Sequence, residues 1–309
     1  MIRVEGLRKI YGKMEALKGI SLEIEQGSIF GFVGPNGAGK TTTMKILATL
    51  MVPTEGKAYI DGVDVTKHPK KVRSLMGYMP DFFGVYERIK VTEYLDFYAS
   101  CYGISRGKRR SIIADLLELT DLNFKADAYV DSLSRGMKQR LCLARSLVHD
   151  PKVLLLDEPA SGLDPRARVE MRELLRELKN MGKSIIISSH ILPELAELCT
   201  EVGIIEGGEL VAVGSMDSIT AQLQQERLIQ VKVQDNISAA RAMMEENPWV
   251  AAVNETADGV LQVRFSGNPE EQQKLLRALV LAELPVLSFA ESSNSLEDLF
   301  MQITKGAAR

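Results

Sequence analysis

A glycine-rich loop between a short apolar stretch and a run of threonines constrains the fold of this chain more than any other feature. The loop reads G-x-x-x-x-G-K-T from Gly34 to Thr41, directly after the apolar residues 29–33. The apolar stretch predicts a buried strand, and the residues from Thr42 onward predict a helix. Glycines let backbone N–H groups wrap a phosphate chain, and the helix N-terminus adds a partial positive charge. This order predicts an α/β domain that binds a nucleoside triphosphate.

Two side chains of the loop have predicted roles of their own. Lys40 is expected to reach the β- and γ-phosphates, and the Thr41 hydroxyl is expected to ligate Mg²⁺. The other candidate nucleotide-binding residues of this segment are Gly34, Pro35, Asn36, Gly37, Ala38, Gly39 and Thr42. The loop alone predicts a nucleoside triphosphatase and does not distinguish between the classes of such enzymes.

An acidic pair ends a second apolar strand. The segment KVLLLDEP places Asp157 and Glu158 directly after the apolar residues 153–156. Asp157 is a candidate ligand of Mg²⁺, and Glu158 is placed to orient or deprotonate an attacking water. Together with the phosphate loop, this pair predicts hydrolysis of the bound nucleotide.

Composition limits the kinds of partner. The chain has 309 residues, enough for about two domains, with 45% hydrophobic and 26% charged residues. A net charge of −3 and a pI near 5.8 argue against a broad nucleic-acid-binding surface, so no nucleic-acid partner is expected. Three scattered cysteines fit a reducing compartment better than a disulfide framework. Because no uncharged apolar run reaches about 18 residues, another chain must span the membrane if this protein serves a membrane process.

Four further features lie around these two motifs in a specific order. The segment LSRGM occupies residues 133–137, SGLD occupies 161–164, His190 ends the apolar segment SIIISSH, and Tyr11 precedes the phosphate loop. In this order the chain resembles the ATP-binding subunits of ABC transporters, over residues 1 to about 220. LSRGM resembles the LSGGQ signature of that family, SGLD its D-loop and His190 its switch histidine.

The resemblance implies roles for individual residues. Ser134 and Gly136 would contact the γ-phosphate of ATP bound to a second copy, and Asp164 belongs to the D-loop at the same nucleotide site. His190 would contact the γ-phosphate as a catalytic residue alongside Lys40 and Glu158. Tyr11 would stack on adenine, although packing against a strand edge stays open for it, as a core position does for His190.

The resemblance also implies the architecture and the assembly. The expected fold is an α/β P-loop NTPase of ABC type, with a mostly parallel core sheet, an antiparallel β subdomain and a helical subdomain over about 82–150. Residues 1–219 would form this ATP-binding domain. Residues 220–309 show a βαββαβ pattern with a terminal helix, which predicts a small ferredoxin-like accessory or regulatory domain. Two ATP molecules would join two copies as a homodimer on a separate membrane permease, at the cytoplasmic side of the membrane.

Two positions depart from the family pattern. Arg135 and Met137 replace a glycine and the glutamine of the signature, which resembles the branch of exporters for drugs, antibiotics and polysaccharides. Asp81 stands where the family usually has a glutamine near the ATP phosphates. Aspartate keeps an oxygen ligand for Mg²⁺, so Asp81 is included among the candidate metal ligands. The leading expectation is therefore the ATPase subunit of an exporter of drug, lipid or polysaccharide type.

Two alternative functions remain open at this point. Some amino-acid importers carry a ferredoxin-like sensing domain after the ATPase. Other ABC ATPases act on ribosomes or DNA without transport, but such proteins usually have two cassettes or an inserted coiled coil. The single uninterrupted cassette and the acidic composition argue against this second alternative.

Overall fold

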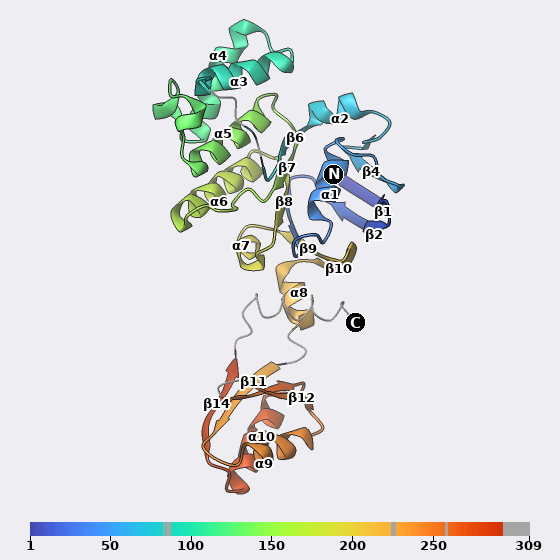
Figure 1. Ribbon diagram of the computed structural model, residues 1–309, viewed down its shortest axis with the longest axis vertical. Coiled ribbons are helices and arrows are strands. Elements are labelled where there is room, and N and C mark those ends of the chain that lie inside the picture. Colours follow the sequence, from blue (N-terminus) through green and yellow to red (C-terminus); the bar gives the residue numbers. More distant parts are fainter. Residues whose placement is uncertain (83, 85–87, 224–226, 257–258, 293–309) are drawn as a thin grey trace. The chain divides into compact units, whose positions relative to one another are not determined.

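The computed structural model describes residues 1–82, 84, 88–223, 227–256 and 259–292 (Figure 1). The chain forms two compact units, Met1–Met216 and Asp217–Ile303. The domain boundary proposed from the sequence, after residue 219, stays a prediction.

The first unit begins with a four-stranded antiparallel sheet of order β2-β1-β4-β5. Ile2 pairs with Ile24 on one side and with Ile60 on the other, and all three side chains are fully buried. Alternating buried and exposed residues along these strands place one face of the sheet on the core. The strands are β1 (Ile2–Tyr11), β2 (Met14–Ile24), β4 (Glu55–Ile60) and β5 (Val63–Asp64).

A six-stranded sheet of order β10-β9-β3-β8-β7-β6 forms the centre of this unit. Its strands are β3 (Ile29–Val33), β6 (Met76–Met79), β7 (Val153–Asp157), β8 (Ser184–Ser189), β9 (Glu201–Glu206) and β10 (Glu209–Gly214). All neighbours pair in parallel except β10, which is antiparallel to β9. Every residue of β3, β7 and β8 is buried, as expected of strands covered on both faces. The carboxyl ends of these three strands therefore meet at one edge of the sheet.

Three helices of the first unit form a group of their own. Figure 1 shows α3, α4 and α5 together at one side of the first unit, within the range predicted for the helical subdomain. Arg145 of α5 donates to the Tyr94 hydroxyl of α3 at 3.3 Å and lies over the Tyr98 ring, which fastens two of these helices together. The helices of this unit are α1 (Lys40–Leu47), α2 (Pro69–Leu75), α3 (Val91–Cys101), α4 (Arg106–Leu119), α5 (Arg135–Leu147), α6 (Pro165–Asn180) and α7 (Leu192–Ala196), with 3₁₀-helices at Asn123–Lys125 and Val130–Ser132.

The second unit has the predicted ferredoxin-like order. A helix, α8 (Met216–Leu223), comes before its strands. The elements are β11 (Arg227–Val233), α9 (Ile237–Glu245), β12 (Val250–Glu255), β13 (Leu261–Phe265), α10 (Pro269–Leu281) and β14 (Val286–Ser292), and the antiparallel sheet has the order β12-β13-β11-β14. Ile229, Val231 and Val233 alternate along β11, and all three are buried. The terminal helix predicted near 295–303 lies outside the described residues.

In the ranges that the structure describes, no helix combines the length and the apolar character that crossing a bilayer requires.

Candidate active site

The phosphate loop connects β3 to α1, as the motif predicts, and α1 begins slightly earlier than expected, at Lys40. Gly39 has φ 115°, and a Cβ there would lie 2.7 Å from Leu17 Cδ2 and 2.9 Å from Ala16 O, so only glycine fits this position. The Lys40 side chain is buried, and its Nζ donates to the carbonyl oxygens of Gly34 at 2.6 Å and Pro35 at 3.2 Å. Burial lowers the pKa of Lys40, against an opposing effect of the Glu158 charge. The phosphate loop thus wraps around the ammonium group of Lys40.

Asp157 lies at the carboxyl end of β7 and is 1% exposed. Its Oδ1 accepts hydrogen bonds from Ser188 Oγ at 2.6 Å and Thr41 Oγ1 at 3.2 Å. Its Oδ2 is buried without a hydrogen-bond partner among the described residues. Burial raises the pKa of Asp157, although both hydroxyl groups oppose the shift. A carboxylate oxygen without a partner beside a threonine hydroxyl is a donor set that suits Mg²⁺.

Glu158 follows in a left-handed conformation with φ 52°, which is rare for a residue with a side chain and common at functional sites. Its Oε1 lies 3.6 Å from Lys40 Nζ, and its Oε2 lies 3.0 Å from His190 Nδ1. The structure therefore brings the three predicted catalytic residues together. Burial raises the pKa of Glu158, with His190 and Lys40 opposing the shift. A carboxylate whose pKa is raised in this way is a stronger base than an exposed glutamate.

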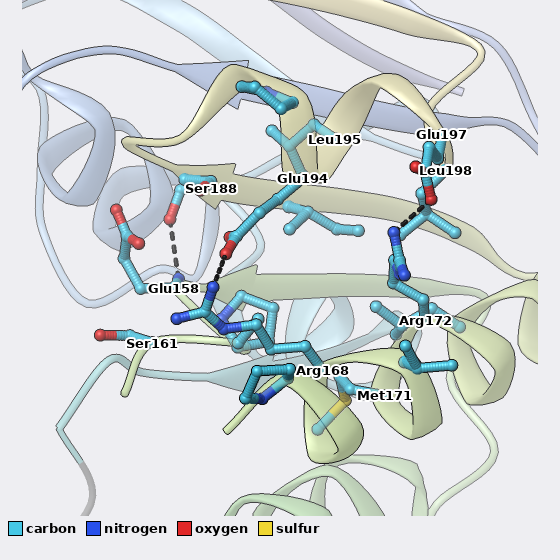
Figure 2. A pocket seen from close by; sticks show the side chains of 18 residues that line it. Glu158, Ser161, Arg168, Met171, Arg172, Ser188, Glu194, Leu195, Glu197 and Leu198 are labelled. Carbon is cyan, nitrogen blue, oxygen red and sulfur yellow. Dashed lines mark hydrogen bonds and ion pairs between the residues drawn. The ribbon is translucent and has the colours of Figure 1, made fainter. Parts of the chain in front are cut away.

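Ser188 is a residue of this site that the sequence did not single out. In the parallel register, Asp157 of β7 lies opposite Ser188 of β8. The Ser188 hydroxyl accepts from the Glu158 N–H at 2.9 Å (Figure 2). It also donates to Asp157 Oδ1, so one side chain holds both acidic residues. The available signal was a serine in place of an apolar residue near the end of a fully buried strand.

Ser134 and Asp164 begin two helices at an exposed surface. The Ser134 hydroxyl is the N-cap of α5 and accepts from Met137 N at 3.3 Å, and Asp164 is the N-cap of α6 and accepts from Ala167 N at 2.9 Å. Both residues, with Gly136, line a depression of about 230 Å³. In a single copy their hydrogen bonds serve their own helices, so their predicted contacts with a second copy stay a prediction.

Tyr11 and Asp81 lie at positions compatible with their predicted roles, which stay predictions. Tyr11 ends β1 with 39% of its surface exposed, and its hydroxyl donates to Met51 Sδ at 2.7 Å. Lys9 Nζ lies 5.3 Å from the centre of the Tyr11 ring. Asp81 follows β6 and is exposed, and its negative charge adds a smaller contribution to the rise that burial causes in the Asp157 pKa. The negative charge of Asp81 thus acts on Asp157, one of the candidate metal ligands.

An ion pair between Arg168 and Glu194 lies beside Glu158. Figure 2 shows Arg168 of α6 joined to Glu194 of α7, and both line a cavity of about 350 Å³. Arg168 Nη1 lies 2.9 Å from Glu194 Oε1, and Arg168 Nε donates to the Leu163 carbonyl at 3.0 Å. The loop 161–164 is therefore connected to α7, which follows His190. Nothing in the sequence pattern marked Arg168.

Two family models match successive parts of the chain. Residues 17–161 match the family model described as ABC transporter. Residues 214–304 match a second model, described as the C-terminal domain of ATP-binding proteins like DrrA1-3.

Several relatives match almost the whole chain. The linearmycin resistance ATP-binding protein LnrL of Bacillus subtilis is 30% identical over 98% of this chain and 98% of its own length. The bacitracin transport ATP-binding protein BcrA of Bacillus licheniformis is 34% identical over 99% and 98%. The Nod factor export ATP-binding protein I of Ralstonia nicotianae is 34% identical over 98% and 94%.

Solved structures match about 70% of the chain. A structure of the ATP-binding subunit of an ABC transporter is similar with a TM-score of 0.66 and 29% identity, covering 72% of this chain and 93% of that one. A dimeric structure of a bacterial ABC transporter cassette is similar with a TM-score of 0.65 and 26% identity, covering 70% and 99%.

Proposed function

We propose, for a chain that belongs to the family of ABC transporter ATP-binding proteins, that two copies bind ATP between them and power a separate membrane permease. The chain is an ATPase subunit of the exporter type, and ATP is its nucleotide. The observation that carries the proposal is the convergence of Lys40, Glu158 and His190 at the carboxyl edge of the parallel sheet. Lys40 ends the phosphate loop and begins α1, and Glu158 and His190 directly follow β7 and β8.

Mg²⁺ fits the residues at this edge. Thr41 and Asp157 would hold the ion, with Asp81 as a third candidate, and the ion would neutralise charge on the phosphates when bound. Among the described residues no group of three or more His, Cys, Asp or Glu side chains could hold a metal ion alone. A site with few protein ligands is typical of Mg²⁺ that binds together with nucleotide phosphates.

The residues of the site have separate tasks in hydrolysis. Lys40 exchanges its hydrogen bonds to Gly34 and Pro35 for bonds to phosphate oxygens. Glu158 orients the attacking water and accepts its proton, which the raised pKa of Glu158 favours. His190 holds the Glu158 carboxylate through Nδ1, and its other ring nitrogen would act toward the γ-phosphate. Tyr11 offers an exposed ring face to adenine.

A second copy completes each nucleotide site in this proposal. Ser134 and Gly136 lie at an exposed helix N-terminus, a position suited to an anion supplied by a partner. The similarity to a dimeric ABC transporter cassette supports this assembly. ATP would favour the dimer because its γ-phosphate contacts both copies, and hydrolysis would remove those contacts.

Export is the direction that the relatives support. The three relatives described above are named for linearmycin resistance, bacitracin transport and Nod factor export. The second unit matches a C-terminal domain of DrrA1-3-like ATP-binding proteins, which favours the exporter branch over an importer with an amino-acid sensor. The subunit would bind its permease at the cytoplasmic face of the membrane.

The test is co-purification of a tagged Glu158→Gln protein with ATP from gently solubilised membranes of its own host. This substitution should slow hydrolysis and hold the ATP-bound assembly together. We expect a multi-spanning membrane protein in stoichiometric amount. Recovery of ribosomal or DNA-repair proteins with no membrane partner would contradict the proposal.

A further inference from the structure

Arg135, the residue that replaces a glycine in the signature segment, lies against the loop 161–164. It is the first residue of α5 and is exposed. Its guanidinium occupies the space over Gly162: the Nη1 and Nη2 nitrogens lie 2.5 and 2.6 Å from the point that a Cβ on Gly162 would take. Real Cβ atoms do not approach other atoms this closely, so a side chain at residue 162 would have to displace the Arg135 guanidinium from this position.

Gly162 is suited to this contact in two ways. Its φ of 66° lies in the left-handed region, which glycine adopts without steric cost. Its missing side chain leaves a flat surface on which the planar, weakly hydrated guanidinium can lie. A lysine ammonium has neither the planar shape nor the weak hydration that favours such packing.

Other contacts join the same loop to α5. Gln139 Nε2 donates to the Ser161 carbonyl at 3.0 Å. At Gly136, a Cβ would lie 3.4 Å from Leu163 Cδ2, so the helix and the loop are in close contact there. Arg135 follows the N-cap Ser134 and lies over Gly162, at the solvent-exposed end of the contact between α5 and the loop. The loop and the N-terminus of α5 thus form one packed surface.

We propose that Arg135 is a positioning residue, whose guanidinium holds the loop 161–164 against the N-terminus of α5. Ser134 and Asp164 are then presented together, in a fixed relation, to the nucleotide site of the second copy. This inference rests on the proposed function, because it assigns the surface to ATP-dependent pairing of two copies. A glycine at residue 135 would leave the loop free of this constraint.

The contact itself is tested by a double-mutant cycle on the full chain. Asparagine tolerates a positive φ, so Gly162→Asn introduces mainly a collision with the guanidinium. We expect Gly162→Asn to lower the urea midpoint when Arg135 is present, and to lower it clearly less in the Arg135→Ala background. Equal shifts in both backgrounds would overturn the contact.

The functional part is tested by ATP-dependent dimerisation in the Glu158→Gln background, followed by light scattering. We expect Arg135→Ala to raise the ATP concentration for half-maximal dimer about tenfold, equivalent to the loss of one good contact. Binding of a fluorescent ATP analogue to the monomer should stay unchanged, because the monomer's phosphate loop is untouched. The matched control is Arg166→Ala, which removes a positive charge from the same depression at an 89% exposed side chain.

Arg135→Lys separates positioning from charge. We expect it to behave like Arg135→Ala, because the planar group is lost and the charge is kept. Full rescue by lysine, or an unchanged ATP concentration for Arg135→Ala, would overturn the inference. If the Glu158→Gln protein with Arg135 intact stays monomeric in ATP, the proposed function fails instead, and the stability cycle alone decides the coupling of Arg135 with Gly162.

Discussion

The two units of the chain differ in what they bury. In the part of the chain that the structure describes, all buried polar or charged residues belong to the first unit. They are Lys40, Thr43, Asp64, Thr120, Gln139, Ser146, Asp157, Ser184, Ser188 and Ser189. The core of the second unit consists of aliphatic and aromatic side chains with Met244 and Ala240.

The buried polar residues indicate that the catalytic site lies in the first unit. Burial of a polar group costs free energy unless it is hydrogen-bonded or paired, so such groups are rare in a core that serves stability alone. In the first unit four of the ten, Lys40, Asp157, Ser188 and Ser189, lie where β3, β7 and β8 end. There Ser188 donates to Asp157 Oδ1, and Lys40 pairs with Glu158. The second unit is built like an accessory domain whose core needs no such groups.

The largest effect on ATP turnover is expected from Glu158→Gln. Loss of a positioned general base typically lowers a rate by about 10²–10⁴-fold, and nucleotide binding should persist because Lys40 and the loop are intact. Steady-state ATPase rates and binding of a fluorescent ATP analogue measure the two effects. Glu23→Gln, at an exposed position of β2, is the matched control. An ATPase rate within twofold of the unchanged protein would remove Glu158 from its assigned role.

Ser188→Ala should have the next largest effect. It removes the hydroxyl that joins Asp157 and the Glu158 backbone, so ATPase activity should fall by about tenfold and the free energy of unfolding by about 1–3 kcal/mol. Ser184→Ala is the control, because its buried hydroxyl lies on the same strand and accepts from Gly27 N at 2.8 Å. It should cost similar stability and leave turnover unchanged. Equal losses of activity in both variants would show that the Ser188 effect is only structural.

A smaller effect concerns pH and stability without nucleotide. Because burial raises the folded-state pKa of Glu158 above its ordinary value of 4.5, the folded protein binds this proton more tightly than the unfolded chain. The contribution of this group to stability therefore falls as pH rises between the ordinary and the raised pKa. Glu158→Gln removes this loss, so its stability relative to the unchanged protein should grow with pH. Urea midpoints from about pH 4 to 8 measure it. A relative stability that declines with pH would contradict the raised pKa.

The smallest effect on nucleotide binding should come from the second unit. Phe265→Ala empties a fully buried position of that core and should cost about 3–5 kcal/mol there, with ATP affinity unchanged. Phe32→Ala, at a buried position of β3, is the matched change in the first unit and should weaken both stability and ATP binding. Nucleotide titrations at a temperature where both variants stay folded make the comparison. Weakened ATP binding in Phe265→Ala would break the division of tasks between the units.

Much of the fold followed from local patterns. The apolar runs at 29–33 and 153–156 identified strands that are buried on both faces, and the βαββαβ pattern after residue 220 identified the order of elements in the second unit. The glycine loop marked the edge of the sheet at which the site forms. These features depend on neighbours in sequence, which is why the chain alone reveals them.

The missing parts of the site depend on pairings across the fold. The role of Ser188 follows from the register that places it beside Asp157 on the neighbouring strand. The contact of Arg135 with Gly162 and the link from Arg168 to Glu194 each join different elements. No periodicity or motif spacing encodes such contacts, so only the structure reveals them.

The most direct test of the account mixes two inactive variants. Lys40→Ala disables the phosphate loop, and Ser134→Asp keeps a side chain that can cap α5 while adding a negative charge that repels phosphate. In a mixed dimer one site carries both defects and the other carries neither. We predict that the mixture regains ATPase activity that neither variant has alone. Activity no greater than the sum of the separate variants would contradict the claim that two copies build each ATP site.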